Sequence, residues 1–160
     1  MIKTEYGFNT SDVNSLFDVA AALRLTKNMI PTHKPKLISE PSLKSLFIEM
    51  LFGDMVLASG TGFTCQTKAG PVLVTNRHNV TGRHQETEKC LDEKNLAVPN
   101  RIRITHNRIG QLGNMIEVYE PLYKDVDIPL WKEHPVLGSS ADFVALPLTQ
   151  LTNVALFPYC

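Results

Sequence analysis

Two residues of this sequence have types and positions that suit acid–base chemistry. His78 follows the apolar run PVLVTN (71–76), where the strand pattern stops, and Asp142 opens the apolar run ADFVALPL (141–148). A carboxylate that enters a buried strand needs a hydrogen-bonded or charged partner, and a histidine is a natural one. An Asp that accepts from one imidazole nitrogen fixes the tautomer and leaves the other nitrogen available as a base. We therefore expect a tertiary contact between His78 and Asp142.

The segments that must position these two residues have the pattern of a mainly β protein. Apolar or alternating runs separated by short turns are typical of strands, and the absence of helical patterns between them indicates an antiparallel barrel or sandwich. Gly60 and Gly62 lie inside one such run and predict a bulge or a close backbone approach. The predicted strands cover residues 45–52, 55–66, 71–76, 101–107, 115–123, 126–131 and 141–148.

The amino-terminal part of the chain differs from the rest. Residues 11–24 place apolar side chains at helical spacing, with Thr10 or Ser11 available as a cap, and predict one amphipathic helix. Residues 25–43 contain three prolines with basic residues between them, which indicates a linker or a wrapped arm. We therefore expect a helix and arm over residues 1–43 and a β domain over residues 44–160.

Composition limits the classes of function. The chain has 160 residues, 43% of them hydrophobic, which suits one compact domain. Its 16 basic and 16 acidic residues give no net charge, so charge does not argue for nucleic acid or an anionic membrane as a partner. The apolar stretches are too short for a membrane span, and the start lacks the apolar segment of a secretory signal. The odd number of cysteines, three, favours a reducing, cytoplasmic location. No cofactor and no metal is expected.

Three motifs together resemble a known family. SGTGF (59–63), PVLVTNRHNV (71–80) and ADFVALPL (141–148) resemble the amino-terminal half of the trypsin-like, chymotrypsin-fold serine peptidases, nearest to their bacterial, HtrA-like branch. The resemblance covers about residues 44–148. It implies a six-stranded antiparallel Greek-key barrel, with His78 as the general base and Asp142 as the carboxylate that orients it.

The sequence departs from that family in several ways. The family carries its nucleophilic serine in G-x-S-G, within a second barrel, and this motif does not occur here. Ser139 and Ser140, beside Asp142, are interpreted as strand-entry residues. Asn79 stands where secreted trypsins have a cysteine. The polar segment 85–100 looks like an insert, which we expect on the surface beside the cleft.

Two other chemistries are possible for the same residues. His78, His84, Cys90 and His106 could be zinc ligands, although their spacing matches no standard pattern. Cys65 or Cys90 could act as a nucleophile beside His78 in a Cys–His enzyme. For Cys65, a buried thiol with a structural role is the simpler interpretation, because the residue lies within a predicted strand.

Two functions from different classes follow. In the first, the chain is the base-bearing portion of a trypsin-like serine endopeptidase that acts on a protein or peptide substrate, and these 160 residues alone are inactive because the nucleophile is missing. In the second, it is a non-catalytic module with a protease-like fold that binds a protein. In both, a second β-barrel or a protein partner would cover the apolar face around His78 and Asp142.

Overall fold

A computed structural model describes residues 38–159 of the chain. Two short helices lie in this part, α2 (Glu40–Lys44) and α3 (Arg77–Thr81), and neither is long and apolar enough to cross a membrane. The strands are β1 (Ser45–Phe52), β2 (Met55–Thr67), β3 (Gly70–Thr75), β4 (Arg101–Arg108), β5 (Gln111–Pro121), β6 (Lys132–Glu133), β7 (Val144–Pro147) and β8 (Val154–Ala155). The helix expected over residues 11–24 lies outside the described residues, as does most of the expected arm.

Most of the predicted strands are confirmed, and one is wrong. The segments expected at 45–52, 55–66, 71–76 and 101–107 correspond to β1 to β4. The segment expected at 115–123 overlaps β5, which begins four residues earlier, and the one at 141–148 contains β7. Residues 126–131 form turns, with a single bridge between Tyr123 and Pro129. Asp127 has a φ of 65°, and Pro129 has no N–H to donate, so this run is unsuited to a ladder. The two-residue strands β6 and β8 were not predicted.

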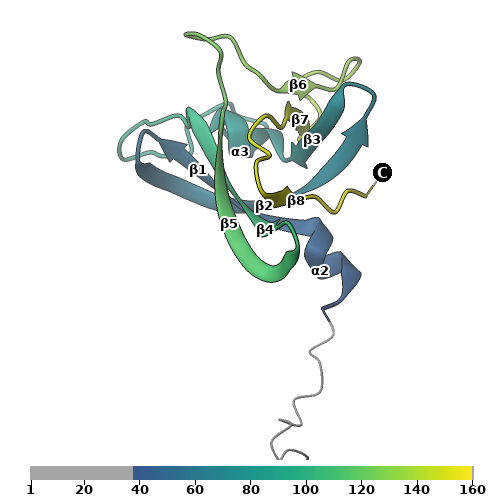
Figure 1. Cartoon of the computed structure of the whole chain (residues 1–160). Helices are drawn as coiled ribbons and strands as arrows, with labels where there is room; N and C mark the ends of the chain where they lie inside the picture. The colour runs from purple at the N-terminus through teal and green to yellow at the C-terminus, as the bar shows by residue number, and fades with distance from the viewer. Residues whose placement is uncertain (1–37, 160) are drawn as a thin grey trace, which may run out of the picture. The chain divides into compact units, whose positions relative to one another are not determined.

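The strands form one antiparallel sheet with the order β5-β4-β1-β2-β3-β7-β6, and β8 pairs with the end of β4 (Figure 1). β1 lies between β2, with which it pairs along its length, and β4, with which it pairs over residues 47–51. β3 joins β2 to β7, with Thr75 opposite Val144. This register brings the end of β3, and therefore the start of α3, beside the residues that lead into β7.

The hydrophobic core shows that the sheet is curled. Its side chains form a single cluster. They come from β1, from β4 on one side of β1 in the strand order, from β3 and β7 on the other side, from α3 and from the loops between β5 and β7. A flat sheet would hold β4 and β7 apart, so their inward faces must turn toward each other. The fully buried members include Ile48, Leu73, Val80, Ile102, Ile104, Leu122, Val144 and Leu146.

The expected mainly β class is confirmed, but the structure does not show the expected six-stranded barrel, because the sheet is open: its order ends at β5 on one side and at β7 with the short β6 on the other. In the part of the chain that the structure describes, no ladder joins β5 to β7. Glu120 of β5, only 1% exposed, takes the place of a ladder. Its carboxylate accepts hydrogen bonds from the backbone N–H groups of Thr149 (2.6 Å) and Gln150 (2.7 Å) and from the Thr149 hydroxyl (2.7 Å). A side chain therefore satisfies donors that a closing strand pair would otherwise use.

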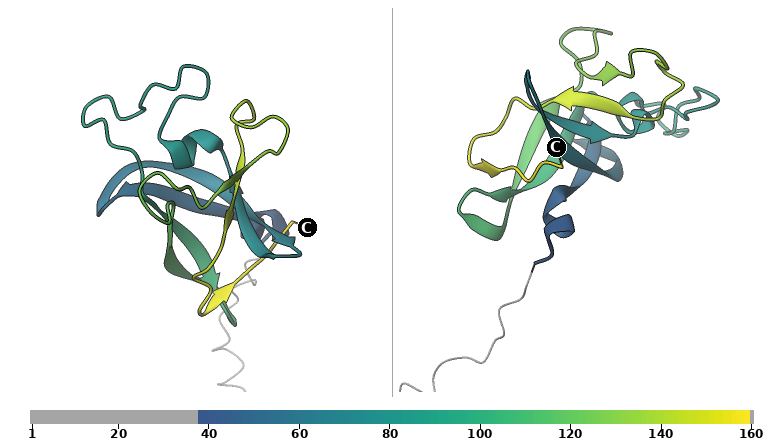
Figure 2. Two further views of the ribbon diagram at one scale, coloured as in Figure 1. Left: turned by 90° about the horizontal axis from the view of Figure 1, so that it is seen from above. Right: turned by 90° about the vertical axis from the view of Figure 1, so that its right-hand side faces the viewer.

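Two loops project from the same side of the sheet, one on each side of α3 (Figure 2, left). The first, over residues 82–100, leaves α3 at Gly82, which has a φ of 61° and donates its N–H to the carbonyl of His78. A Cβ on Gly82 would lie 2.5 Å from Cδ of Pro99, so glycine is required here for both conformation and space. The second loop leads from β5 to β7.

We predict that Glu120→Ala destabilises the fold by about 2–4 kcal/mol, because the substitution removes a buried carboxylate that accepts three hydrogen bonds from the segment after β7. Urea unfolding followed by circular dichroism measures the change. Glu117→Ala, on the same strand with a side chain 53% exposed, is the matched control and should cost less than about 1 kcal/mol. Equal losses in the two variants would contradict a closing role for Glu120.

His106 is an unusual member of the inward face of β4. It is 1% exposed, and neither ring nitrogen has a hydrogen-bond partner among the described residues. Burial lowers the pKa of its imidazole from 6.5 to about 4, since the charged form would lose its hydration. The folded protein therefore holds a neutral imidazole at pH values where the unfolded chain already binds a proton.

We predict that the free energy of unfolding falls as the pH is lowered from about 6.5 to about 4, because only the unfolded state gains the His106 proton in this range. The loss should approach about 3 kcal/mol at most. Urea unfolding at a series of pH values measures it. His106→Leu should flatten the dependence, whereas His84→Leu, on a surface loop, should keep it. A slope unchanged in His106→Leu would exclude this cause.

Candidate functional site

The structure brings His78 and Asp142 into direct contact across 64 residues of sequence. Nδ1 of His78 lies 2.8 Å from Oδ2 and 3.0 Å from Oδ1 of Asp142. His78 is the second residue of α3. Asp142, expected inside the strand predicted over residues 141–148, lies in a bend two residues before β7. The carboxylate occupies Nδ1, so Nε2 is the nitrogen left for chemistry. The His78 side chain is 37% exposed, which makes that nitrogen accessible.

Asp142 is held as a charged hydrogen-bond acceptor. Partial burial works to raise the pKa of its carboxyl group, but donors outweigh this effect and hold the pKa below its usual value. The donors are the backbone N–H of His78 (3.1 Å), the His78 ring and the Asn76 amide (3.1 Å). A carboxylate with several donors stays ionised near neutral pH. It can therefore stabilise the positive charge that the imidazole acquires on accepting a proton.

α3 is anchored to the sheet by a short chain of hydrogen bonds. The buried amide of Asn79 donates to the hydroxyl of Thr75 (2.9 Å), which donates to the carbonyl of Thr61 (2.8 Å). A Cβ on Gly60 would lie 2.9 Å from Nδ2 of Asn79, so the glycine makes room for this amide. The close approach expected at Gly60 is thus confirmed, while the bulge of the ladder lies between Met50 and Leu51 instead.

Arg77 ties the two loops beside α3 together. Its side chain, 10% exposed, donates from Nη1 to Glu88 (2.8 Å) in the first loop and from Nε to Glu133 (3.0 Å) in the second. Burial acts to lower the pKa of the guanidinium, but the hydrogen bonds to Glu133 and Glu88 outweigh it and the pKa is raised. Arg77 therefore stays charged and fixes both loops around His78.

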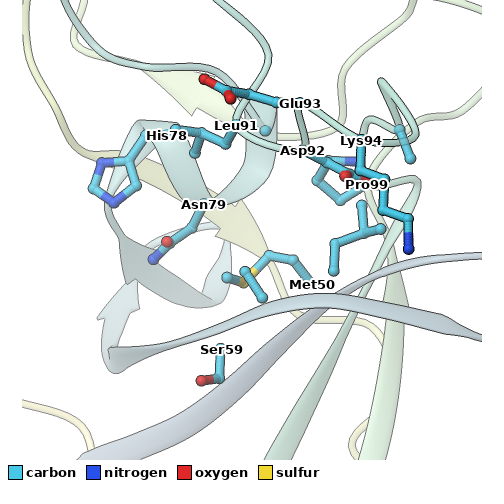
Figure 3. A pocket seen from close by; sticks show the side chains of 13 residues that line it. Met50, Ser59, His78, Asn79, Leu91, Asp92, Glu93, Lys94 and Pro99 are labelled. Atoms are coloured by element: carbon cyan, nitrogen blue, oxygen red, sulfur yellow. The ribbon is translucent and has the colours of Figure 1, made fainter.

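A pocket of about 590 Å³ opens beside His78 (Figure 3). His78 and Asn79 lie at one end, and Asp92, Lys94 and Pro99 lie at the other. Part of the segment 85–100, which was expected on the surface beside the cleft, forms one wall of this pocket. The apolar lining is Met50, Leu57, Ala58, Leu91, Ala97 and Pro99. The pocket has the size and lining to hold a side chain of a ligand bound at His78.

A second, apolar groove of about 490 Å³ is lined in part by Asn76, the residue that donates to the Asp142 carboxylate. Phe63, Phe143 and Tyr159 line it and are 37%, 47% and 53% exposed. Phe63 and Tyr159 make an edge-to-face contact with ring centroids 5.3 Å apart. Phe143 directly follows Asp142, so the groove adjoins the carboxylate. Three exposed aromatic rings in one groove form a surface suited to a macromolecular contact.

The structure does not assemble the alternative sites. The described residues contain no group of three or more His, Cys, Asp or Glu side chains that could hold a metal, so the zinc alternative with His78, His84, Cys90 and His106 has no support. Neither Cys65 nor Cys90 lines the His78 pocket, and the Cys90 thiol faces the carbonyls of Asp92 and Ala97, each at 3.6 Å. Ser139 and Ser140 lie in a turn before Asp142.

Several contributors to the site were not assigned from the sequence. Asn76, Arg77 and Asn79 surround His78 in TNRHN. Asn76 and Arg77 have partners far along the chain, whereas Asn79 bonds the nearby Thr75. The cue in the sequence is their position. Three polar residues and a histidine follow directly on a buried strand, where each must find a specific partner. Glu88 and Glu133 give no comparable cue, because Glu88 lies in a polar loop and Glu133 in the two-residue strand β6, which the sequence did not predict.

Comparison of the chain with protein-family models, with curated proteins and with solved structures finds no match.

We predict that Arg77→Ala releases the loop over residues 82–100, because Glu88 and Glu133 lose the cation that joins them. Limited proteolysis followed by mass spectrometry should show cleavage in this loop at least tenfold faster than in the wild type, a change of about 1.4 kcal/mol in the opening equilibrium. Lys68→Ala, in the exposed turn between β2 and β3, is the control and should leave the rate unchanged. A wild-type cleavage rate in Arg77→Ala would contradict the role of Arg77 in holding the two loops together.

Proposed function

We propose that this chain is the base-bearing portion of a trypsin-like serine endopeptidase. The observation that carries the proposal is the pairing of His78 Nδ1 with the Asp142 carboxylate at 2.8 Å, with the opposite nitrogen accessible beside a pocket. The motif resemblance supports the same assignment, because it selects these two residues independently of the contact. The order His before Asp along the chain agrees with the chymotrypsin arrangement.

In this proposal His78 and Asp142 have distinct roles. Nε2 of His78 takes the proton of a serine hydroxyl as the hydroxyl attacks the peptide carbonyl, and later gives a proton to the leaving amine. Asp142 keeps the proton on Nδ1, so that Nε2 presents its lone pair, and stabilises the imidazolium that forms. The serine and its oxyanion donors are not assigned to these 160 residues, which alone are predicted to be inactive.

The groove lined by Phe63, Phe143 and Tyr159 supports a second component. Covering it would bury three aromatic side chains and shield the adjacent Asp142 from water. A second β-barrel that carries the serine is the component that fits the peptidase proposal. Such a barrel would also make the His78–Asp142 interaction stronger, because the local dielectric constant would fall.

The same groove supports a second candidate, a non-catalytic module that binds a protein partner through this face. The two candidates differ in whether the assembled protein contains a serine that His78 activates. In either form we place the protein in the cytoplasm, on the odd number of cysteines and the presence of Asn79 where secreted trypsins have a cysteine.

We predict that His78→Ala abolishes peptide hydrolysis by the protein as its native source makes it. The rate should fall by about 10⁴-fold or more, since the substitution removes the group proposed to take the proton of the serine. Cleavage of a library of quenched fluorescent peptides measures it. His84→Ala, a histidine of the neighbouring loop, is the matched control and should retain the wild-type rate. Equal rates for wild type and His78→Ala would exclude the triad assignment.

Asp142→Asn makes the test sharper, because the fold can keep its shape while the charge is lost. An amide at this position favours the wrong imidazole tautomer, and turnover should fall by about 10⁴-fold. A fluorophosphonate probe separates the two candidates. Labelling of the assembled wild-type protein, but not of His78→Ala, supports the peptidase. A wild-type protein that is neither labelled nor active but retains a partner on the groove supports the binding module.

A further inference from the structure

Asn76 stands at the N-cap position of α3 but does not act as a capping residue. Asparagine at this position ordinarily accepts a backbone N–H of the first helical turn through its side-chain oxygen. Here the Asn76 side chain makes no such bond. Its Nδ2 instead donates to the Asp142 carboxylate at Oδ2 (3.1 Å) and to the Asp142 backbone carbonyl (3.2 Å).

The missing cap is supplied by Asp142. Its Oδ1 accepts the backbone N–H of His78 at 3.1 Å, which is a bond that an N-cap side chain would normally make. The Asn76 amide is therefore free of a capping bond and donates to two groups of Asp142, the side-chain carboxylate and the backbone carbonyl. A single amide that bonds both groups restrains rotation of the carboxylate about its Cβ–Cγ bond.

We propose that Asn76 is a positioning residue that locks the plane of the Asp142 carboxylate, so that both oxygens face His78. The bond needs no group from outside this chain, because Asn76 and Asp142 are brought together by the pairing of β3 with β7. The contact between His78 and Asp142 is therefore formed by residues of this chain alone, and no partner on the groove is needed to make it. The consequence of Asn76 for catalysis rests on the proposed function, whereas its hold on Asp142 does not.

The position of Asn76 makes a purely structural role a poor explanation. The residue is exposed, and its side chain makes no capping bond that its removal would break. It lines the groove that contains Phe143 and Tyr159, next to the carboxylate. Substitution should therefore leave the fold in place and act on Asp142 and, through it, on the His78 ring.

Nuclear magnetic resonance of the 160-residue chain tests this without any hydrolysis. In Asn76→Ala, the pKa of Asp142, followed by its carboxyl ¹³C shift, should rise, since a donor to the charged form is lost. The ¹⁵N shifts of His78 should show a smaller population of the Nδ1–H tautomer, because a carboxylate that rotates holds that proton less well. Thermal unfolding should remain close to that of the wild type.

Asn76→Ser separates positioning from capping. Serine is a good N-cap, but its short side chain ends too close to the backbone to reach Oδ2. If Asn76 positions Asp142, the Ser and Ala variants should show the same changes. Asn114→Ala, which removes an exposed amide bonded to Gln111, is the control and should show none. Wild-type values of the Asp142 pKa and the His78 tautomer in Asn76→Ser or Asn76→Ala would overturn the proposal.

A kinetic measurement links the result to the proposed function. In the assembled native protein, Asn76→Ala should lower kcat while leaving KM nearly unchanged, because the substitution alters the base and not the binding of substrate. A wild-type protein without turnover would argue against the peptidase, and the resonance shifts would still decide the role of Asn76. Unchanged resonance shifts in an active protein would overturn the role of Asn76 alone.

Discussion

The Asp142 carboxylate is the group on which the arrangement at this end of the molecule depends. It accepts hydrogen bonds from the backbone and ring of His78 and from the amide of Asn76. These bonds join the segment after β3 to the segment before β7, cap the first turn of α3 and fix the orientation of an imidazole. Each of these effects requires that the carboxylate be ionised, and the same donors keep it so.

Charged side chains perform a similar connecting role elsewhere in the described part. Glu120 spans the opening between β5 and the residues after β7, and Arg77 joins the loops on the two sides of α3. In both cases the partners are groups that a regular ladder does not reach. The curled sheet therefore supplies the core, while buried charged groups close its open side and fix the loops near His78. Removing Glu120 or Arg77 is expected to cost more than removing an exposed ion pair, because each of these side chains is itself buried and makes more than one hydrogen bond.

The two hollows beside His78 and Asp142 differ in what they offer. The pocket next to His78 is walled by the loop that Arg77 holds, so its shape depends on an ion pair as well as on packing. The groove next to Asp142 is lined by aromatic rings of β2, of the residue after Asp142 and of the carboxy-terminal segment. His78 lines the first hollow, and Asn76, which donates to Asp142, lines the second, so both hollows adjoin the His78–Asp142 pair.

The sequence determined the strands that carry an unbroken apolar or alternating pattern, β1 to β4, because burial on one or both faces leaves that pattern in the residues themselves. It also predicted the contact between His78 and Asp142, since a carboxylate at the entry to a buried strand needs a partner and a histidine can supply one. The open side of the sheet, the turns over residues 126–131 and the roles of Asn76, Arg77 and Glu120 were decided only by the tertiary structure. For a polar residue in a loop or at a strand end, the sequence does not indicate which residue is its hydrogen-bond partner. Which donor meets which acceptor is fixed by the register of strands far apart in the chain.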